Sequence, residues 1–163
     1  MKKYWLHFKT ITLHKWYVLK ECFSVGLYYQ GIVHDLSKYS PLEFFTSARY
    51  FQGGSSPVNA EKDKLGYSVS WLNHKAKNKH HWHYWTDVEK GKLIAVPMPE
   101  KYILEMACDF VGASKAYNKE KFTTLTPLEY YGKNKNEMIM TEDTHRVFKL
   151  YLKDYWLHGK FIT

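Results

Sequence analysis

The sequence has 163 residues, of which 45% are hydrophobic and 25% charged, a balance that excludes a disordered chain and is typical of a globular protein. The length suits one domain, and we expect residues 1–163 to form it around a hydrophobic core. The net charge of +8 fits either an anionic partner or a surface of solvated lysines. Because only Arg49 and Arg146 are arginines, the composition argues against a nucleic-acid-binding protein and favours the solvated surface.

The two cysteines, Cys22 and Cys108, lie in apolar segments and form no Cys-x-x-Cys pair. We expect both to be reduced core thiols of a cytoplasmic protein. The N-terminal segment contains His7 and Lys9 and has no continuous apolar run, so we expect no signal peptide and no membrane-spanning helix. The sequence does not predict an oligomeric state.

The first predicted element is a helix over residues 4–25. One of its stripes has the spacing of a single helix face and consists of His7, Ile11, His14 and Val18. Gly26 is a natural end for this helix, and a short segment over residues 27–33 leads to His34-Asp35.

The segment Ser40-Pro41-Leu42-Glu43 predicts the start of the next helix. Ser40 can cap the helix, Pro41 suits its first position and Glu43 closes a capping box, so we interpret Glu43 as a capping residue. This helix runs to about Phe51. A turn-rich loop follows over residues 52–59, and then a single helix over residues 60–77.

Residues 78–97 are the least regular part of the sequence, and no segment predicts a strand. A helix follows from about Pro99 to Tyr117, and Thr126-Pro127-Leu128-Glu129 repeats the capping-box pattern. The last helix begins near Thr141 and ends at Gly159. The sequence therefore predicts an all-α protein.

The adjacent pair His34-Asp35 is the first candidate for chemistry. Neighbouring side chains on a helix point about 100° apart, so they do not normally share a ligand. A metal ion at a helix end or bend would bring them together, and a surface turn capped by Asp35 is the alternative interpretation.

Two further residues stand out because they lie in apolar helices. His14 belongs to the apolar stripe of the first helix, where a hydrogen-bonded core histidine is the commoner explanation. Asp109 lies among apolar residues of the helix over 99–117, and a buried carboxylate needs a cation or strong donors. A metal ion would satisfy Asp109, and so would a buried lysine or arginine.

The order His14, His34-Asp35, Asp109 resembles that of the HD-domain superfamily of metal-dependent phosphohydrolases, and His34-Asp35-Leu36-Ser37-Lys38 resembles its His-Asp-x-x-Lys hallmark. The resemblance covers about residues 10–115 and is closest to a small HD-like branch of unassigned function. It implies an HD-domain-like bundle of about five to seven helices. The Gly-Tyr-Pro motif of the cyclic-dinucleotide phosphodiesterases is missing, as are the extra segments of the large nucleotide triphosphohydrolases, so the resemblance does not extend to a substrate.

The histidine-rich segment after residue 70 matches a second feature of this resemblance. Several HD hydrolases with two metal ions add histidine ligands between the His-Asp pair and the last aspartate. His74 and one of His80 or His81, with His81 slightly preferred, match these positions approximately. The alternative is a structural aromatic cluster.

The resemblance implies one or two divalent transition-metal ions, with Mn, Fe, Co, Ni and Zn not distinguished. Asp35 would bridge two ions or orient the attacking water, and Lys38 would meet the phosphate, pair with a carboxylate or simply be solvated. Arg49 is a weaker candidate for the phosphate, and we expect His145 to be structural or exposed.

The expected function is metal-dependent hydrolysis of a small phosphoester. A nucleotide is the favoured substrate, with the aromatic segment from Trp82 to Trp85 as a wall that would stack a nucleobase. Two alternatives remain open from the sequence: an HD-type di-iron oxygenase, and a binding module that holds a metal only for stability.

Overall fold

The computed structural model describes residues 2–53 and 55–162. Within them the α-helices are α1 (Lys2–Ser24), α2 (Tyr28–Val33), α3 (Pro41–Tyr50), α4 (Pro57–Leu65), α5 (Val69–Lys77), α6 (Glu100–Asn118), α7 (Thr126–Asn134) and α8 (Glu142–His158). Short 3-10 turns are η1 (Leu36–Tyr39), η2 (Trp82–Trp85), η3 (Lys119–Lys121) and η4 (Lys135–Glu137), and the strands are β1 (Thr86–Glu89) and β2 (Lys92–Ala95). The predominance of helix confirms the all-α bundle predicted from the sequence.

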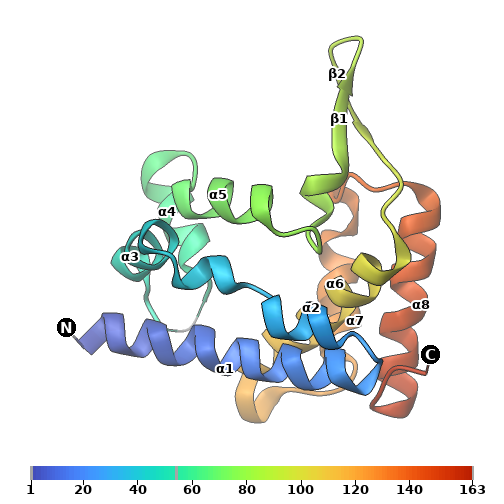
Figure 1. The fold of residues 1–163 in the computed structure, drawn as a ribbon, viewed down its shortest axis with the longest axis horizontal. Coiled ribbons are helices and arrows are strands. Elements are labelled where there is room, and N and C mark those ends of the chain that lie inside the picture. Colours follow the sequence, from blue (N-terminus) through green and yellow to red (C-terminus); the bar gives the residue numbers. More distant parts are fainter. Residues whose placement is uncertain (1, 54, 163) are drawn as a thin grey trace.

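The hydrophobic core is built around α6. This helix is apolar over most of its circumference, as is typical of a helix enclosed by others, and it packs against α1 and α8. Gly112 of α6 lies directly against Val18 of α1, where a Cβ atom would approach the Val18 backbone nitrogen to 3.0 Å. The two helices that carry His14 and Asp109 are therefore held in close contact (Figure 1).

The prediction of a single helix over residues 60–77 is wrong, because the chain forms two helices there, α4 and α5. Gly66 ends α4 in the left-handed conformation, with φ of +81°, and the Ser68 hydroxyl caps α5. The fully buried Glu61 fixes the junction by accepting hydrogen bonds from Ser68, Ser70 and the Val69 amide. The extra break gives eight α-helices among the described residues, one more than the expected maximum.

The expectation of no strand is also wrong, because β1 and β2 form an antiparallel hairpin that projects from the helical body (Figure 1). Lys90 and Gly91 at its tip both have positive φ values, of 49° and 76°. That combination is typical of a two-residue hairpin turn, and the lysine at its first position disguised the turn in the sequence.

The aromatic segment before the hairpin is packed inward. Trp82 and Trp85 contact the hydrophobic core cluster, and the Trp85 indole donates a hydrogen bond to the Lys79 carbonyl. These contacts use the rings as packing groups, which argues against the nucleobase-stacking wall expected from the sequence.

The predicted helix starts agree with the structure at two of three helices. Ser40 and Thr141 cap α3 and α8 through their hydroxyl oxygens, and α8 ends at Gly159. The third prediction, a cap at Thr126, is wrong because α7 already includes this residue. The Thr126 hydroxyl instead accepts a hydrogen bond from the Thr123 amide.

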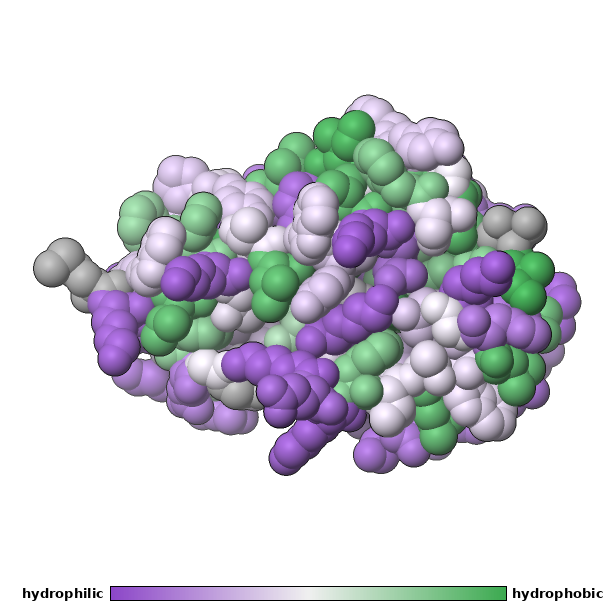
Figure 2. Space-filling model, turned by 90° about the horizontal axis from the view of Figure 1, so that it is seen from below, coloured by the Kyte–Doolittle hydropathy of each residue, from purple (hydrophilic) through white to green (hydrophobic). Residues whose placement is uncertain are grey.

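The outer face of α1 mixes aromatic and cationic side chains, so hydrophobic and hydrophilic groups alternate on this side of the molecule (Figure 2). Lys9 lies over the exposed ring of Trp5 and Lys20 over that of Trp16, at 5.1 and 5.6 Å from the ring centroids. None of the described helices is long and apolar enough to cross a membrane.

Candidate metal centre

The turn that carries His34 and Asp35 brings two neighbouring side chains to one point. Helix α2 ends at Val33, His34 leaves the helical conformation with φ of −48° and ψ of 125°, and Asp35 is left-handed with φ of 55°. Lys15 of α1 holds the turn by donating hydrogen bonds to the carbonyls of Ile32 and His34, each at 2.7 Å. The bend therefore directs both side chains toward the interior, where they are 0% and 2% exposed.

One oxygen of Asp35 faces a first group of ligand-type side chains. Asp35 Oδ2 lies 3.2 Å from His14 Nε2 and 3.3 Å from His34 Nε2. Asp109 Oδ1 approaches the same two nitrogens, at 3.1 Å from His14 and 3.5 Å from His34. These four residues can place one ligand atom each within 4.8 Å of one another, which is close enough to hold a single ion.

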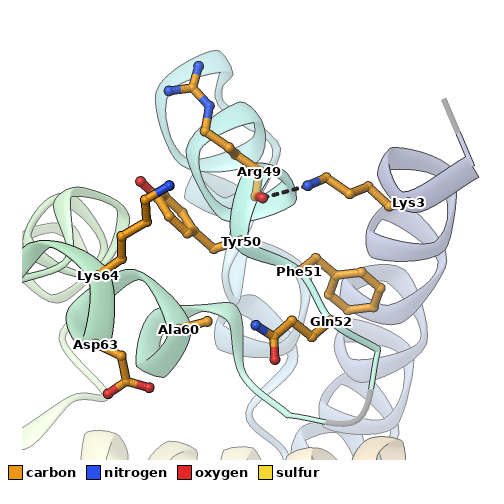
Figure 3. Close-up of a pocket in the computed structure, with 8 residues that line it drawn as sticks. All are labelled: Lys3, Arg49, Tyr50, Phe51, Gln52, Ala60, Asp63 and Lys64. Carbon is orange, nitrogen blue, oxygen red and sulfur yellow. Dashed lines mark hydrogen bonds between the residues drawn. The ribbon is translucent and has the colours of Figure 1, made fainter.

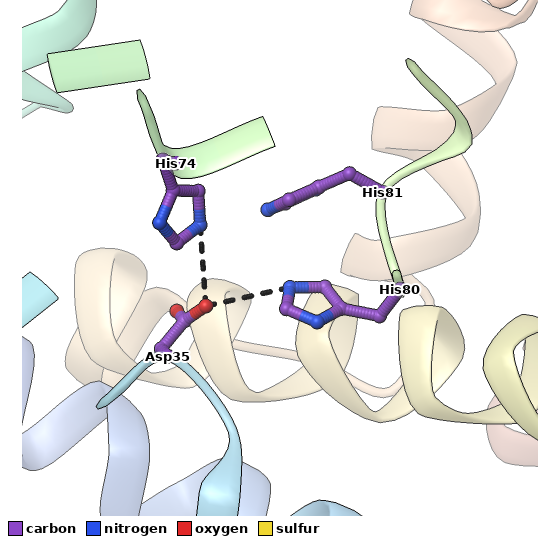
Figure 4. Close-up of side chains that lie close together, drawn as sticks. All are labelled: Asp35, His74, His80 and His81. Carbon is purple, nitrogen blue, oxygen red and sulfur yellow. Dashed lines mark ion pairs between the residues drawn. The ribbon is translucent and has the colours of Figure 1, made fainter. Parts of the chain in front are cut away.

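The other oxygen of Asp35 faces a second group. Asp35 Oδ1 lies 3.2 Å from His74 Nε2 and 3.4 Å from His80 Nε2, and His81 lies beside them (Figure 4). Asp35, His74, His80 and His81 again offer ligand atoms within 4.8 Å of one another. Asp35 therefore lies between two potential ion sites and could contribute one oxygen to each.

Glu105 of α6 orients one histidine from each group. Its Oε1 atom lies 3.1 Å from His34 Nδ1 and 3.2 Å from His80 Nδ1. When each Nδ1–H donates to this carboxylate, each Nε2 presents its lone pair to the centre. Histidine ligands of metal ions are commonly held in this way.

Glu43 of α3 plays the same part for His74. Glu43 Oε2 lies 2.9 Å from His74 Nδ1 and also accepts a hydrogen bond from Ser37, while Oε1 accepts one from Asn73. Glu43 is buried, with its side chain 3% exposed. The interpretation of Glu43 as only a capping residue is therefore wrong: its amide donates to Ser40, but its carboxylate supports His74.

Electrostatics favour a cation at this centre. Burial alone would raise the pKa values of Asp35 and Asp109, yet the surrounding histidines, and for Asp35 also Lys38, hold both well below the usual range. Burial would lower the pKa of His34, but the charge of Asp35 and the hydrogen bonds that the His34 ring donates to Asp109 and Glu105 raise it well above its usual value. The carboxylates are thus ionised, and in such a low-dielectric interior they need positive charge.

Several buried polar atoms at the centre have no hydrogen-bond partner among the described residues. Such atoms are rare in proteins, and each calls for an explanation such as an unfilled ion site. They are His34 Nε2, Asp35 Oδ1, His74 Nε2, His80 Nε2 and His81 Nε2. All five are of ligand type and belong to the two groups, so a metal ion fits these residues.

Comparison with known proteins adds the family. Residues 3–154 match the family described as a family of unknown function, DUF5662. The chain belongs to DUF5662. No curated protein and no solved structure matches this DUF5662 chain.

The structure places the remaining predicted residues of the DUF5662 chain differently. Lys38 reaches the centre, with Nζ 2.5 Å from Asp35 Oδ2. Arg49 does not, because it is exposed near the C-terminal end of α3 and lines a separate cavity of about 460 Å³ with Lys3 and Lys64 (Figure 3). His145 is structural, since its ring bonds the Tyr131 hydroxyl and the Met138 carbonyl.

The choice between His80 and His81 does not arise in this DUF5662 chain, because both belong to the second group. His80 is 2% exposed and fixed by Glu105, whereas His81 packs against Trp71 with ring centroids 4.8 Å apart. Burial, together with the neighbouring His80, keeps the pKa of His81 well below its usual value, so its ring is neutral and free to coordinate.

Proposed function

We propose that the protein hydrolyses a small phosphoester with one or two divalent transition-metal ions. The observation that carries this proposal is the shared aspartate: the two oxygens of Asp35 face two groups of buried ligand-type side chains. Paired ions close together are a recurrent device for in-line displacement at phosphorus. The order of His14, His34-Asp35 and Asp109 supports the same proposal through its resemblance to the HD-domain superfamily.

Each of the two ligand groups would hold one ion in this proposal. His14, His34, Asp35 and Asp109 would hold one ion, and Asp35, His74, His80 and His81 the other. When bound, such ions make water more acidic and polarise a phosphoryl oxygen. Nitrogen and carboxylate ligands together suit Mn, Fe, Co, Ni or Zn without choosing among them.

Two side chains act directly on the substrate or the water in this proposal. Asp35 is ionised and can orient the attacking water through an oxygen lone pair. Lys38 has three protons on Nζ, of which one contacts Asp35, so the others can donate to a phosphate oxygen. Its partly buried position would strengthen that contact relative to one in open water.

The test begins with metal analysis of the purified protein, followed by assays on phosphomonoesters and phosphodiesters with Mn, Co, Ni, Fe and Zn. We expect metal-dependent release of phosphate or alcohol by the wild type. Asp35→Asn should abolish turnover, and Lys38→Ala should lower it about 100-fold while metal content is retained. The exposed Lys153→Ala is the matched control and should behave as wild type.

Three results would contradict the proposal. The first is no cleavage of any phosphoester by metal-loaded wild type, and the second is full activity of Asp35→Asn. The third is a bound oxo-bridged iron pair in a protein without phosphatase activity, which would favour the di-iron oxygenase instead. Unfolding by a chelator in a protein without any turnover would favour the binding module.

A further inference from the structure

A cavity of about 90 Å³ lies beside the candidate metal centre. It is lined by residues of α1, η1, α3, the start of α4, α5 and the end of α6. Two of its lining residues, Lys38 and His74, also contact Asp35, at 2.5 and 3.2 Å. The cavity is therefore continuous with the second ligand group and is placed to receive whatever is attached to a phosphate at Lys38.

His7 is the polar group in this cavity that the metal centre does not explain. Its side chain is 3% exposed and packs against the rings of Phe44 and Phe51, with centroids 5.5 and 5.2 Å away. Its Nδ1 atom has no hydrogen-bond partner among the described residues. Burial, with a contribution from the charge of Lys38, lowers the pKa of His7 to about 4, so the ring is neutral at pH 7 and can both donate and accept.

The rest of the lining is nearly neutral. Lys38 is its cation, and the carboxylate of Glu43 is already occupied by hydrogen bonds from the His74 side of the centre. Ser47 and Tyr117 add hydroxyl groups, and Ile11 and Pro57 are apolar. Such a lining suits a neutral group with several hydroxyls better than a charged one, because a second charge would lack a partner.

The size of the cavity limits what can enter. A volume of about 90 Å³ is well below the roughly 300–1,000 Å³ of pockets that hold larger ligands. A nucleoside does not fit such a space, but a chain of three or four carbons does.

We infer that this cavity binds the alcohol part of the substrate and selects short polyol phosphates, of about the size of glycerol phosphate, over nucleotides. The inference rests on the proposed hydrolase function and replaces the nucleotide expected from the sequence. The phosphate lies at Lys38 and the metal centre, and hydroxyls of the polyol bond to His7 and Ser47. His7 is a binding residue here and takes no part in bond breaking.

Calorimetry with non-hydrolysable ligands tests this without relying on turnover. The metal-loaded protein is titrated at pH 7.5 with three phosphonates: the analogue of glycerol phosphate, methylphosphonate, which has no polyol, and a nucleoside phosphonate. We expect the glycerol analogue to bind at least tenfold more tightly than the other two. His7→Phe keeps the ring that packs on Phe44 but removes the ring nitrogens.

His7→Phe should bind the glycerol analogue about tenfold more weakly than wild type does, as the loss of one or two hydrogen bonds implies. It should bind methylphosphonate with the same affinity as wild type. Ser47→Ala, which is compatible with helix α3, should show a smaller loss of the same kind, and the exposed His158→Phe should show none.

The outcomes separate the two proposals. Tightest binding of the nucleoside phosphonate, or wild-type affinities in both His7→Phe and Ser47→Ala, would overturn the polyol assignment and leave the hydrolase proposal in place. Failure of all three phosphonates to bind the metal-loaded protein would overturn the hydrolase proposal, and the polyol assignment with it.

Discussion

Asp35 combines a rare backbone conformation with the central position in the candidate site. A left-handed φ costs a residue other than glycine on the order of 1–2 kcal/mol. The conformation is held by the Lys15 hydrogen bonds on one side of the turn and by the contact with Lys38 on the other. Strain of this kind is typical of functional sites, and here it directs His34 and Asp35 to the same point.

Glu105 should tune metal affinity although it need not bind the ion itself. Replacing it by glutamine keeps the shape but weakens its hold on His34 and His80. We expect Glu105→Gln to lower metal affinity about 10–100-fold, measured by competition with a chromophoric chelator. The exposed Glu120→Gln should leave affinity unchanged, and equal affinities of both variants and wild type would show that Glu105 plays no such part.

His7 should make the metal-free protein sensitive to mild acid. Above pH 6.5 its ring is neutral in both states; as pH falls toward 4, the unfolded chain takes up the proton and the folded protein does not. The free energy of unfolding should therefore fall by about 2 kcal/mol between pH 7 and pH 5.

Urea unfolding in the presence of chelator at pH 7 and pH 5 measures this difference. The loss should be about 2 kcal/mol smaller in His7→Phe than in wild type, because phenylalanine does not titrate. The exposed His158→Phe should keep the wild-type difference. The same pH dependence in His7→Phe would assign the acid sensitivity to other groups.

The inner residues of the site could be predicted from the sequence, and the outer ones could not. His14 and Asp109 stand out as ligand-type side chains in apolar helices, and His34-Asp35 as an adjacent pair. Because a capping role alone explained Glu43 in the sequence, its contact with His74 was not predicted. Glu105 left a signal that could have been used, because it lies four residues before Asp109 and so shares its helix face.

The contact between α1 and α6 sets the distance between His14 and Asp109. Val18 follows His14 by four residues and Gly112 follows Asp109 by three, so the closest approach of the two helices lies one turn from the candidate site. A Cβ atom at residue 112 would lie 2.4 Å from Val18 Cγ2 and 3.0 Å from its backbone nitrogen. A rotamer change could relieve the first contact but not the second.

Gly112→Ala should therefore destabilise the protein by about 1–3 kcal/mol through overpacking, and weaken metal binding as the helices separate. Each kcal/mol lowers the thermal midpoint of a protein of this size by about 2–4 °C. Gly132→Ala is the matched control, because nothing lies within 4 Å of its added Cβ and alanine favours the helix. A Gly112→Ala midpoint at or above that of wild type would contradict this account of the packing.

Element boundaries were predicted best where a cap and a hydrophobic stripe agreed, as in α1, α3, α6 and α8. The predicted boundaries were wrong where another residue overrode the local pattern or where the usual turn residues were absent. A single helix was predicted over residues 60–77, but Gly66 and the buried Glu61 divide it. The turn at Lys90-Gly91 lacks the asparagine or aspartate that usually marks such hairpins.

Metal binding should couple the distant parts of the chain, because the ligand groups come from α1, the turn after α2, α5, the segment after α5 and α6. In the unfolded chain these residues are far apart and bind weakly. A ligand present at 1,000 times its dissociation constant then stabilises the folded state by about 4 kcal/mol. Removing the metal with a chelator should lower the thermal midpoint by about 8–16 °C.

Stoichiometry separates the two groups in the same experiment. His74 belongs only to the second group, so His74→Ala should bind one ion instead of two and retain part of the stabilisation. His34 belongs to the first group and is linked through Glu105 to His80 of the second, so His34→Ala should lose more metal and more stability. Metal content by mass spectrometry and midpoints by calorimetry, with and without chelator, give both quantities. Wild-type content and midpoint in both variants would mean that the histidines stabilise the fold without holding an ion, because removing a true ligand must lower occupancy and stability together.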